Sequence, residues 1–259
     1  MVASVPMQRI HNVTQLADLD DDALARCYAY PRHLERPWVR ANFVNSIDGA
    51  FTVDGVSAGL GTDADHRVFT LLRELAEVIV VGAGTVRAEN YGGAHPDPDR
   101  RRAHFRHGIG GSADGTPPPI AVVTASARLD PASTFFTDAE VAPLIVTTAH
   151  AAPDQVAALE QAGARVVVAG EAAIMPAALL RVLAEQGLQR VLCEGGPHLF
   201  GQLAEADLVD ELCLTTAPVL VGGAGGRISL SASGFDTPMH RRQLVLAEDG
   251  TVLARWARR

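Results

Sequence analysis

The stretch Val191-Leu192-Cys193-Glu194-Gly195-Gly196-Pro197 changes abruptly from apolar residues to a double glycine and a proline. A helix-like stretch, Pro197 to Ala206, follows directly, and proline suits the first turn of a helix. Small residues at such a strand-to-helix turn let backbone N–H groups at the helix start approach a phosphate. The stretch therefore predicts an anion site at a strand end, although a tight turn that binds nothing would require the same small residues.

A second glycine corner occurs earlier in the chain. Glu77–Val81 is a buried-strand candidate, and it continues into Gly82-Ala83-Gly84-Thr85-Val86-Arg87-Ala88-Glu89-Asn90. Ligands of open α/β sheets bind in the crevice beyond the carboxyl ends of the strands, so this corner is a candidate for one wall of a crevice. It lacks the third glycine of a dinucleotide-binding fingerprint because Arg87 occupies that place, and it is a weak motif by itself.

Composition and charge exclude several classes of protein. With 259 residues, 47% of them apolar, the chain can bury a sizeable core, and its net charge of −8 argues against a nucleic-acid partner. The three cysteines are widely spaced and the nine histidines form no zinc-binding pattern, so neither a disulfide framework nor a metal site is predicted. No stretch is apolar and long enough to span a bilayer. We expect a cytoplasmic protein without a membrane partner.

Strand-like and helix-like runs alternate beyond residue 36. Thr62 is a predicted helix cap with Asp65 three positions on, and Val68, Leu71 and Leu75 then recur at helical spacing. Such alternation implies right-handed crossovers and a mostly parallel sheet with helices on both faces, while the last two runs flank a turn typical of an antiparallel hairpin. The other predicted helices are Pro153–Gln161 and Pro176–Gln186, and the predicted strands are Trp38–Val44, Glu77–Val81, Ile120–Thr124, Leu144–Thr148, Arg165–Ala169, Arg190–Cys193, Glu211–Thr216, Gln243–Ala247 and Val252–Ala257.

Two segments fall outside this alternation. Residues 1–36 form a predicted N-terminal extension with a helix-like Ala23–Ala29, which either wraps the body or covers a neighbouring subunit, and residues 37–259 form a single predicted domain. Gly92 to Pro119 is the longest stretch read as irregular, and it carries Arg100, Arg101, Arg102 and Arg106. This basic cluster is either a solvated surface loop or an attractor for a substrate phosphate.

Three ordered motifs together carry a family resemblance. They are Ala41-Asn42-Phe43-Val44-Asn45-Ser46-Ile47-Asp48-Gly49, then VGAGTVRAEN at 81–90, then CEGGPHLFGQL at 193–203 followed by LVDEL at 208–212. The set resembles the pyrimidine reductase family of riboflavin biosynthesis, over about residues 37 to 257. The resemblance implies an α/β, dihydrofolate-reductase-like fold with a central, mostly parallel mixed sheet and a C-terminal antiparallel hairpin. It also implies NADPH, a homodimer, and hydride transfer to the ribosyl group of a phosphorylated aminopyrimidine.

The resemblance assigns residues to the cofactor. Gly195 and Gly196 would hold the pyrophosphate at the helix start, and Arg128 would pair with a 2′-phosphate. Leu199 either packs against the cofactor or belongs to the ordinary core. The full set of implied cofactor residues is Gly82, Gly84, Thr85, Thr124, Ser126, Arg128, Gly195, Gly196 and Leu199.

It also assigns residues to the substrate and to proton transfer. Asn42, Ser46, Glu89 and Glu194 fall on positions that face the pyrimidine or the ribose, and Glu89 and Glu194 are candidate proton relays, with solvent as a rival. Asp48 reads better as a turn former than as a catalytic group.

The chain departs from the family pattern at two places. Asn42 stands where many members carry lysine, and Glu89-Asn90-Tyr91 replaces an Asp-Asp-Pro run. The zinc deaminase signature that often accompanies the reductase is absent from the sequence. A reductase of dihydrofolate or another pterin is therefore an alternative function. A nucleotide-binding protein without turnover is an alternative of another class.

Overall fold

The computed structural model describes residues 13–258, whose strands form one ten-stranded sheet in the order β1-β9-β10-β8-β2-β7-β3-β4-β5-β6. Among these strands only β10 runs against its neighbours, while the other pairings are parallel. The strands are β1 Val13–Gln15, β2 Trp38–Ser46, β3 Val78–Gly82, β4 Ile120–Val123, β5 Leu144–Thr147, β6 Arg165–Val168, β7 Arg190–Cys193, β8 Glu211–Ala217, β9 His240–Leu246 and β10 Val252–Ala257.

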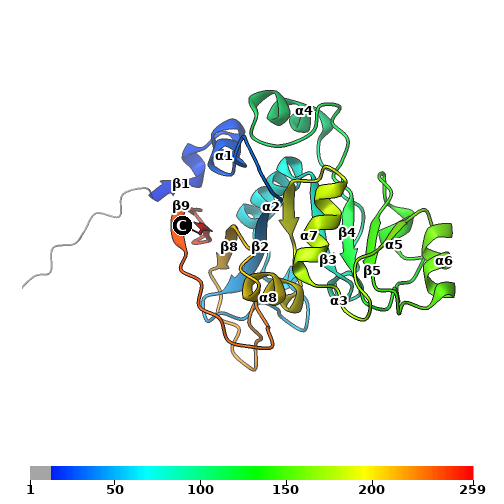
Figure 1. Cartoon of the computed structure of the whole chain (residues 1–259). Helices are drawn as coiled ribbons and strands as arrows, with labels where there is room; N and C mark the ends of the chain where they lie inside the picture. Colours follow the sequence, from blue (N-terminus) through cyan, green and yellow to red (C-terminus); the bar gives the residue numbers. More distant parts are fainter. Residues whose placement is uncertain (1–12, 259) are drawn as a thin grey trace, which may run out of the picture.

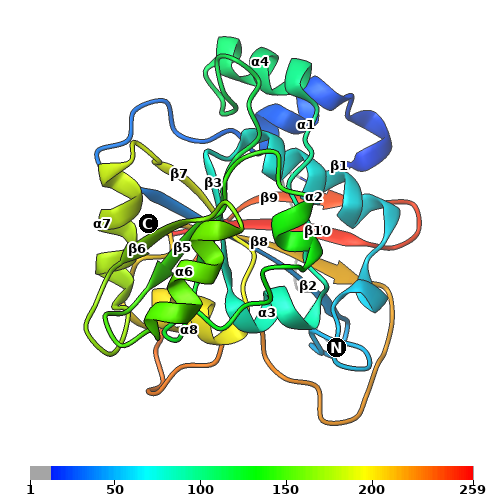
Figure 2. The ribbon, with the colours of Figure 1, turned by 90° about the vertical axis from the view of Figure 1, so that its right-hand side faces the viewer.

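Helices cover both faces of the sheet, as Figures 1 and 2 show, with α7 and α8 on one side and α2 and α3 on the other. Two buried apolar clusters lie between these layers, one on each face. The short connections β7 to α8 and β3 to α3 therefore leave the sheet toward opposite faces. The helices are α1 Asp21–Cys27, α2 Asp63–Leu75, α3 Ala83–Ala88, α4 Pro98–His107, α5 Thr134–Thr137, α6 Pro153–Gln161, α7 Pro176–Glu185 and α8 Pro197–Glu205, and the 3₁₀ turns are η1 Leu16–Asp18 and η2 Ala58–Leu60.

The predicted fold class is confirmed. Every predicted strand is present to within a few residues, and β9 and β10 form the expected antiparallel hairpin. The Thr62 cap is also present, since its hydroxyl accepts the N–H of Asp65 at 3.2 Å. The central strands β7 and β3 are buried on both faces, which explains why they read as near-continuous apolar runs.

The described part of the N-terminal segment, residues 13–36, packs on the body of its own chain. Strand β1 pairs with β9, and Leu24 and Ala25 of α1 belong to the buried cluster that contains α2. Arg67 and Arg100 hold the Asp21 carboxylate at 2.8 and 2.6 Å. The segment thus wraps the body, while the start of the chain lies outside the described residues, and the domain division at residue 36 stays a prediction.

The reading of Gly92 to Pro119 as irregular is wrong. The segment contains α4, whose N-cap Asp97 accepts two backbone N–H groups and whose first turn contains a proline. Arg101 is buried and donates to the carbonyls of Glu74 and Ala76 at 2.7 and 3.0 Å, and Arg100 pairs with Glu74. Two of the four arginines therefore hold α4 against the end of α2, so the cluster does not act as one basic patch. A weakly amphipathic, arginine-rich helix gives almost no periodic signal, which is why it was missed.

A buried ion network lies between the N-terminal segment and β8. Glu211 accepts from Arg40 at 2.7 Å and from Arg255, while Arg40 also donates to the Tyr28 carbonyl at 2.7 Å and packs on the Tyr30 ring. Burial raises the pKa of the Glu211 carboxyl, but the two arginines together lower it by a larger amount, so the net shift is downward. The network fixes the described N-terminal segment to the sheet through charge as well as apolar contact.

Candidate active site

The two glycine corners meet at the carboxyl edge of the sheet. Strands β3 and β7 are parallel neighbours, so Gly82 and Gly195 end beside each other, and the Gly82 N–H donates to the Gly195 carbonyl at 2.7 Å. Gly195 has a φ of +89°, which favours glycine, and the Gly196 backbone packs against Thr85. Residues more than a hundred positions apart thus form one surface, as the sequence predicted.

An open cleft of about 870 Å³ runs along this surface. The start of α8, the α3 turn and the end of β4 line it. Leu199 belongs to the buried core and also lines the cleft, so its contact with a cofactor stays a prediction. The implied cofactor residues that line the cleft are Gly82, Gly84, Thr85, Thr124, Ser126, Gly196 and Leu199. Gly195 is buried and does not line the cleft, whereas Arg87 and His198 do.

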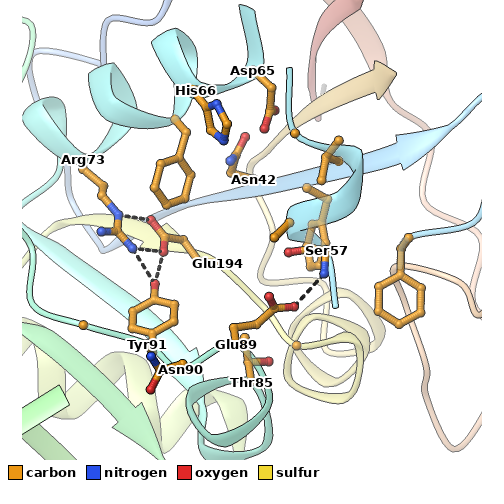
Figure 3. A pocket seen from close by; sticks show the side chains of 18 of the residues that line it. Asn42, Ser57, Asp65, His66, Arg73, Thr85, Glu89, Asn90, Tyr91 and Glu194 are labelled. Carbon is orange, nitrogen blue, oxygen red and sulfur yellow. Dashed lines mark hydrogen bonds and ion pairs between the residues drawn. The ribbon is translucent and has the colours of Figure 1, made fainter. Parts of the chain in front are cut away.

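A second, narrower pocket of about 340 Å³ lies next to the cleft. Figure 3 shows its polar side chains, which come from β2, from α2 and from the ends of α3 and β7. The pocket and the cleft share Phe51, Thr85, Glu89, Gly196 and Pro197 as lining residues. A ligand in the cleft and a ligand in the pocket would therefore touch at this shared wall.

Arg73, Glu194 and Tyr91 form a closed hydrogen-bonded group in the pocket. Arg73 donates Nε and Nη2 to the two Glu194 oxygens at 2.9 and 2.8 Å, and the Tyr91 hydroxyl donates to Glu194 as well. The Arg73 guanidinium also stacks 4.3 Å from the centre of the Phe69 ring. Burial lowers the pKa of Arg73, but the interaction with Glu194 raises it by a larger amount, so the guanidinium stays charged. Glu194 thus holds a cation in place and is not a free carboxylate.

Glu89 lies on the shared wall and ties two segments together. Its Oε1 accepts the backbone N–H of Ser57 at 2.8 Å, which fixes the chain between β2 and α2 against the end of α3. Glu89 lines both the cleft and the pocket. Its position suits a group that touches both ligands.

Asp65 and Asn42 lie on the opposite side of the pocket from Thr85 and Glu89 (Figure 3). Asp65 is only 8% exposed, and the Thr215 hydroxyl on β8 hydrogen-bonds to its carboxylate. Burial raises the pKa of Asp65, although Thr215 and His66 act in the opposite direction. A carboxylate is thus held in a site that disfavours its charge.

Three predicted site residues, Ser46, Arg128 and Gly195, lie outside both cavities. Ser46 is fully buried, where its hydroxyl donates to Asp48 at 2.5 Å and accepts the Ala50 N–H at 2.9 Å, so its assignment to the substrate does not fit the structure. Asp48 accepts the backbone N–H of Gly222 at 2.8 Å, so it ties the turn after β2 to the distant segment after β8 and does not bond only within its own turn. Arg128 is exposed and does not line the cleft, whereas Arg87 lines it and donates to the Arg128 carbonyl at 3.0 Å.

Sequence reasoning missed most of the α2 contribution to the pocket. Arg73 sits in the last helical turn, where basic residues are common because they complement the helix dipole. Asp65 sits at the third helical position, where an acid is common for the same reason at the other end. Each residue has an ordinary local explanation, and only the packing of α2 over the sheet reveals that both line a pocket.

Neither a metal centre nor a membrane segment is found in the part of the chain that the structure describes. Between residues 13 and 258, no three His, Cys, Asp or Glu side chains are placed to hold a metal ion. None of the described helices combines the length and apolar character needed to cross a bilayer.

Known proteins are similar to this chain in sequence and in fold. The chain is 31% identical over 217 residues to the 2,5-diamino-6-ribosylamino-4(3H)-pyrimidinone 5′-phosphate reductase of Methanothermobacter thermautotrophicus, covering 84% of this chain and 94% of that protein. The protein of the same name from Archaeoglobus fulgidus is 30% identical over 190 residues, covering 73% and 83%. A solved pyrimidine reductase-like protein from Corynebacterium diphtheriae has a TM-score of 0.75 and 26% identity, covering 86% of this chain and 92% of that chain. Residues 37–253 match the RibD C-terminal domain, and the chain therefore belongs to this reductase family of riboflavin biosynthesis, with its dihydrofolate-reductase-like fold.

Proposed function

We propose that this protein is an NADPH-dependent reductase that transfers hydride to the ribosyl group of a 5-amino-6-ribosylamino-pyrimidine phosphate. The observation that carries the proposal is the shared wall of Thr85, Glu89 and Gly196 between the cleft and the pocket. Hydride transfer needs donor and acceptor carbons in contact, and two adjoining cavities supply that arrangement. Two relatives at 30% identity or above carry the name of a pyrimidinone phosphate reductase.

The cleft fits a dinucleotide. A Cβ atom at Gly196 would lie 2.6 Å from Thr85 Oγ1, so this position has no room for a side chain. Gly82 and Gly196 both line the cleft where a pyrophosphate would approach. The N-terminus of α8 begins at Pro197 and directs its dipole to the same place. Bound NADPH supplies the hydride. Thr124 and Ser126 lie farther along the cleft, where they would meet the adenosine end.

The preference for a 2′-phosphate has two candidate cations. Arg87 lines the cleft, and its Nη1 donates to the Arg128 carbonyl, so the two residues lie beside each other. Arg128 is exposed, two residues after Ser126, and does not line the cleft. Arginine suits a phosphate because its guanidinium makes paired hydrogen bonds. Arg87 is therefore the stronger candidate, with Arg128 as the second.

The pocket residues bind and orient the substrate. Asn42 stands where many family members carry lysine, and Arg73 supplies a positive charge in the same pocket. The Nη1 of Arg73 is available to a ligand, because Nε and Nη2 bind Glu194 and Tyr91. Asn42 offers an amide to the heterocycle. Glu89, with Oε1 held by Ser57, presents its other oxygen to the shared wall and is the proposed proton donor. The proposed role of Glu194 is to hold the Arg73 guanidinium in position.

The test measures NADPH oxidation with three candidate acceptors. The purified protein is mixed with NADPH and, separately, with the ribosylaminopyrimidine phosphate, its deaminated form and dihydrofolate. We expect turnover of a pyrimidine phosphate. Turnover of dihydrofolate alone would replace the proposal with a pterin reductase, and turnover of none would favour a binding protein.

Three further expectations remain predictions. The resemblance implies a homodimer, and the acidic composition argues against a nucleic-acid partner. The absence of disulfide patterns in the sequence is consistent with a cytoplasmic location.

A further inference from the structure

Asp65 is a second acid in the pocket that the proposed reaction does not use. It lies at the third position of α2, where an acid normally turns back to the N-cap backbone. Here its carboxylate instead hydrogen-bonds to Thr215 on β8 and lines the pocket. Burial to 8% exposure makes this an expensive place for a charge. The helix cap therefore does not explain the side chain.

The carboxylates of the pocket differ in how much acceptor capacity they have left. Glu194 accepts from Arg73 through both oxygens and from Tyr91. Glu89 accepts the Ser57 N–H and lies on the wall shared with the cleft. Asp65 has the Thr215 hydroxyl as its hydrogen-bonding partner, and a carboxylate has about four acceptor sites. Asp65 can thus accept two further hydrogen bonds from a ligand.

The position of Asp65 selects one edge of the substrate ring. The reacting sugar carbon must lie at the wall of Thr85 and Glu89, where the two cavities meet. The sugar is attached through the 6-amino group, and ring atom N3 lies directly across the pyrimidine from C6. Asp65 and Asn42 lie across the pocket from that wall (Figure 3). The N3 edge, with its substituents at C2 and C4, therefore points toward Asp65 and Asn42.

We infer that Asp65 is a specificity residue that accepts hydrogen bonds from N3–H and the 2-amino group, so that the enzyme prefers the 2-amino pyrimidinone over its deaminated, 2-oxo counterpart. The inference rests on the proposed function. An ionised carboxylate is matched by two adjacent N–H donors, whereas the 2-oxo ring presents an acceptor oxygen in place of one donor. That oxygen would face a negative charge in a buried site, so the 2-oxo ring is actively rejected.

An amide at position 65 should shift the preference from the 2-amino ring toward the 2-oxo ring. Asparagine keeps the size of aspartate but offers one acceptor and one donor group, which is the pattern that complements N3–H beside a carbonyl. Asp65→Asn should therefore lower kcat/KM for the 2-amino substrate and raise it for the 2-oxo substrate. The ratio of the two values should fall by about tenfold or more, since each mismatched buried hydrogen bond removes about a factor of ten.

The experiment measures kcat/KM for both heterocycles with wild type, Asp65→Asn and Asp65→Ala. Asp63→Asn is the matched control, because this exposed acid lies in the same helical turn and does not line the pocket. Melting curves verify that each variant folds. Calorimetric titration with the 2-amino and 2-oxo ribitylamino products measures the same preference without turnover.

The outcomes separate the two claims. A reduced ratio in Asp65→Asn, a loss of preference in Asp65→Ala and an unchanged ratio in Asp63→Asn would support the inference. Turnover by wild type with the same ratio in folded Asp65→Asn would overturn the inference and leave the proposed function intact. No turnover of either heterocycle by wild type would overturn both.

Discussion

A Cβ atom added to Gly196 would lie 2.6 Å from Oγ1 of Thr85, so the two glycine corners are packed against each other with no room for a side chain. The Gly82 N–H and the Gly195 carbonyl join the same corners at 2.7 Å. The bare backbone at this junction is what a dinucleotide needs for close approach. Steric changes along the cleft are therefore sharp tests of the cofactor site.

Gly84→Ala should weaken cofactor binding without harming the fold. A Cβ atom at Gly84 meets nothing within 4 Å, and alanine in a helix is favoured over glycine by about 0.5–1 kcal/mol. The added methyl group enters the cleft, so we expect the Kd for NADPH to rise roughly tenfold, or about 1.4 kcal/mol. Gly234→Ala is the control, because its Cβ also meets nothing within 4 Å and it lines neither cavity. Equal NADPH affinity in both variants would contradict the assignment.

Glu194→Gln should affect the pyrimidine more than the cofactor. The change removes the charge that holds Arg73 at 2.8 Å, so the guanidinium loses its fixed orientation in the pocket. Hydrogen bonds to charged groups contribute about 1.5–3 kcal/mol, which corresponds to a KM increase of roughly tenfold or more for the pyrimidine. Steady-state kinetics with each substrate varied in turn measures the split. Tyr91→Phe is a milder variant that removes one hydrogen bond to Glu194 and should give a smaller effect in the same direction. Equal losses for pyrimidine and NADPH would count against this role of Glu194.

The fold could be predicted much further than the site. Continuous apolar runs predict buried strands such as β3 and β7, and the glycines after them predict where the strands end. The sheet and the cleft can therefore be predicted from local patterns. Arg73 and Asp65 carried no such signal, since each fits the ordinary electrostatics of a helix end. Ser46 was assigned to the substrate by motif position, but its hydroxyl is used inside a turn. Which side chains face a pocket depends on how α2 packs over the sheet, and that is not a local property.

Arg87→Ala should reduce the preference for NADPH over NADH more than Arg128→Ala does. Both side chains are exposed, but only Arg87 lines the cleft. A guanidinium–phosphate pair contributes about 1.5–3 kcal/mol, so the ratio of the two dissociation constants should fall by about one to two orders of magnitude. Fluorescence titration of both coenzymes in both variants measures this ratio. A greater loss in Arg128→Ala would restore Arg128 as the main contact, and no loss in either would place the 2′-phosphate elsewhere.

Glu211→Gln should destabilise the fold strongly. Glu211 is buried and neutralises Arg40, which is also fully buried, so the change leaves an uncompensated charge that costs about 3–5 kcal/mol. Urea denaturation measures the free energy of unfolding. Glu185→Gln is the control, because its pair with Arg181 is 68% exposed on both sides and should contribute less than about 1 kcal/mol. The pKa of Glu211 is lowered, so its stabilisation is present above about pH 4.5 and is lost on acidification. Similar unfolding free energies for both variants would contradict the network's role.

Asp65→Asn should stabilise the protein at neutral pH even as it changes substrate preference. Burial raises the pKa of Asp65 above its ordinary value of 3.8, so the folded state binds the proton more tightly than the unfolded state. Stability contributed by this group therefore declines as pH rises through that window, and the full penalty of the ionised form is present at neutral pH. Asparagine at this position removes the penalty. The melting temperature of Asp65→Asn should therefore exceed that of wild type at pH 7, whereas at a pH under about 3.8 the variant should show no such gain. Asp63→Asn should show no such pH-dependent gain. A lower melting temperature for Asp65→Asn at pH 7 would show that the carboxylate stabilises the fold, whereas a gain would mean that it is retained at a cost to stability, as expected of a group that serves a ligand.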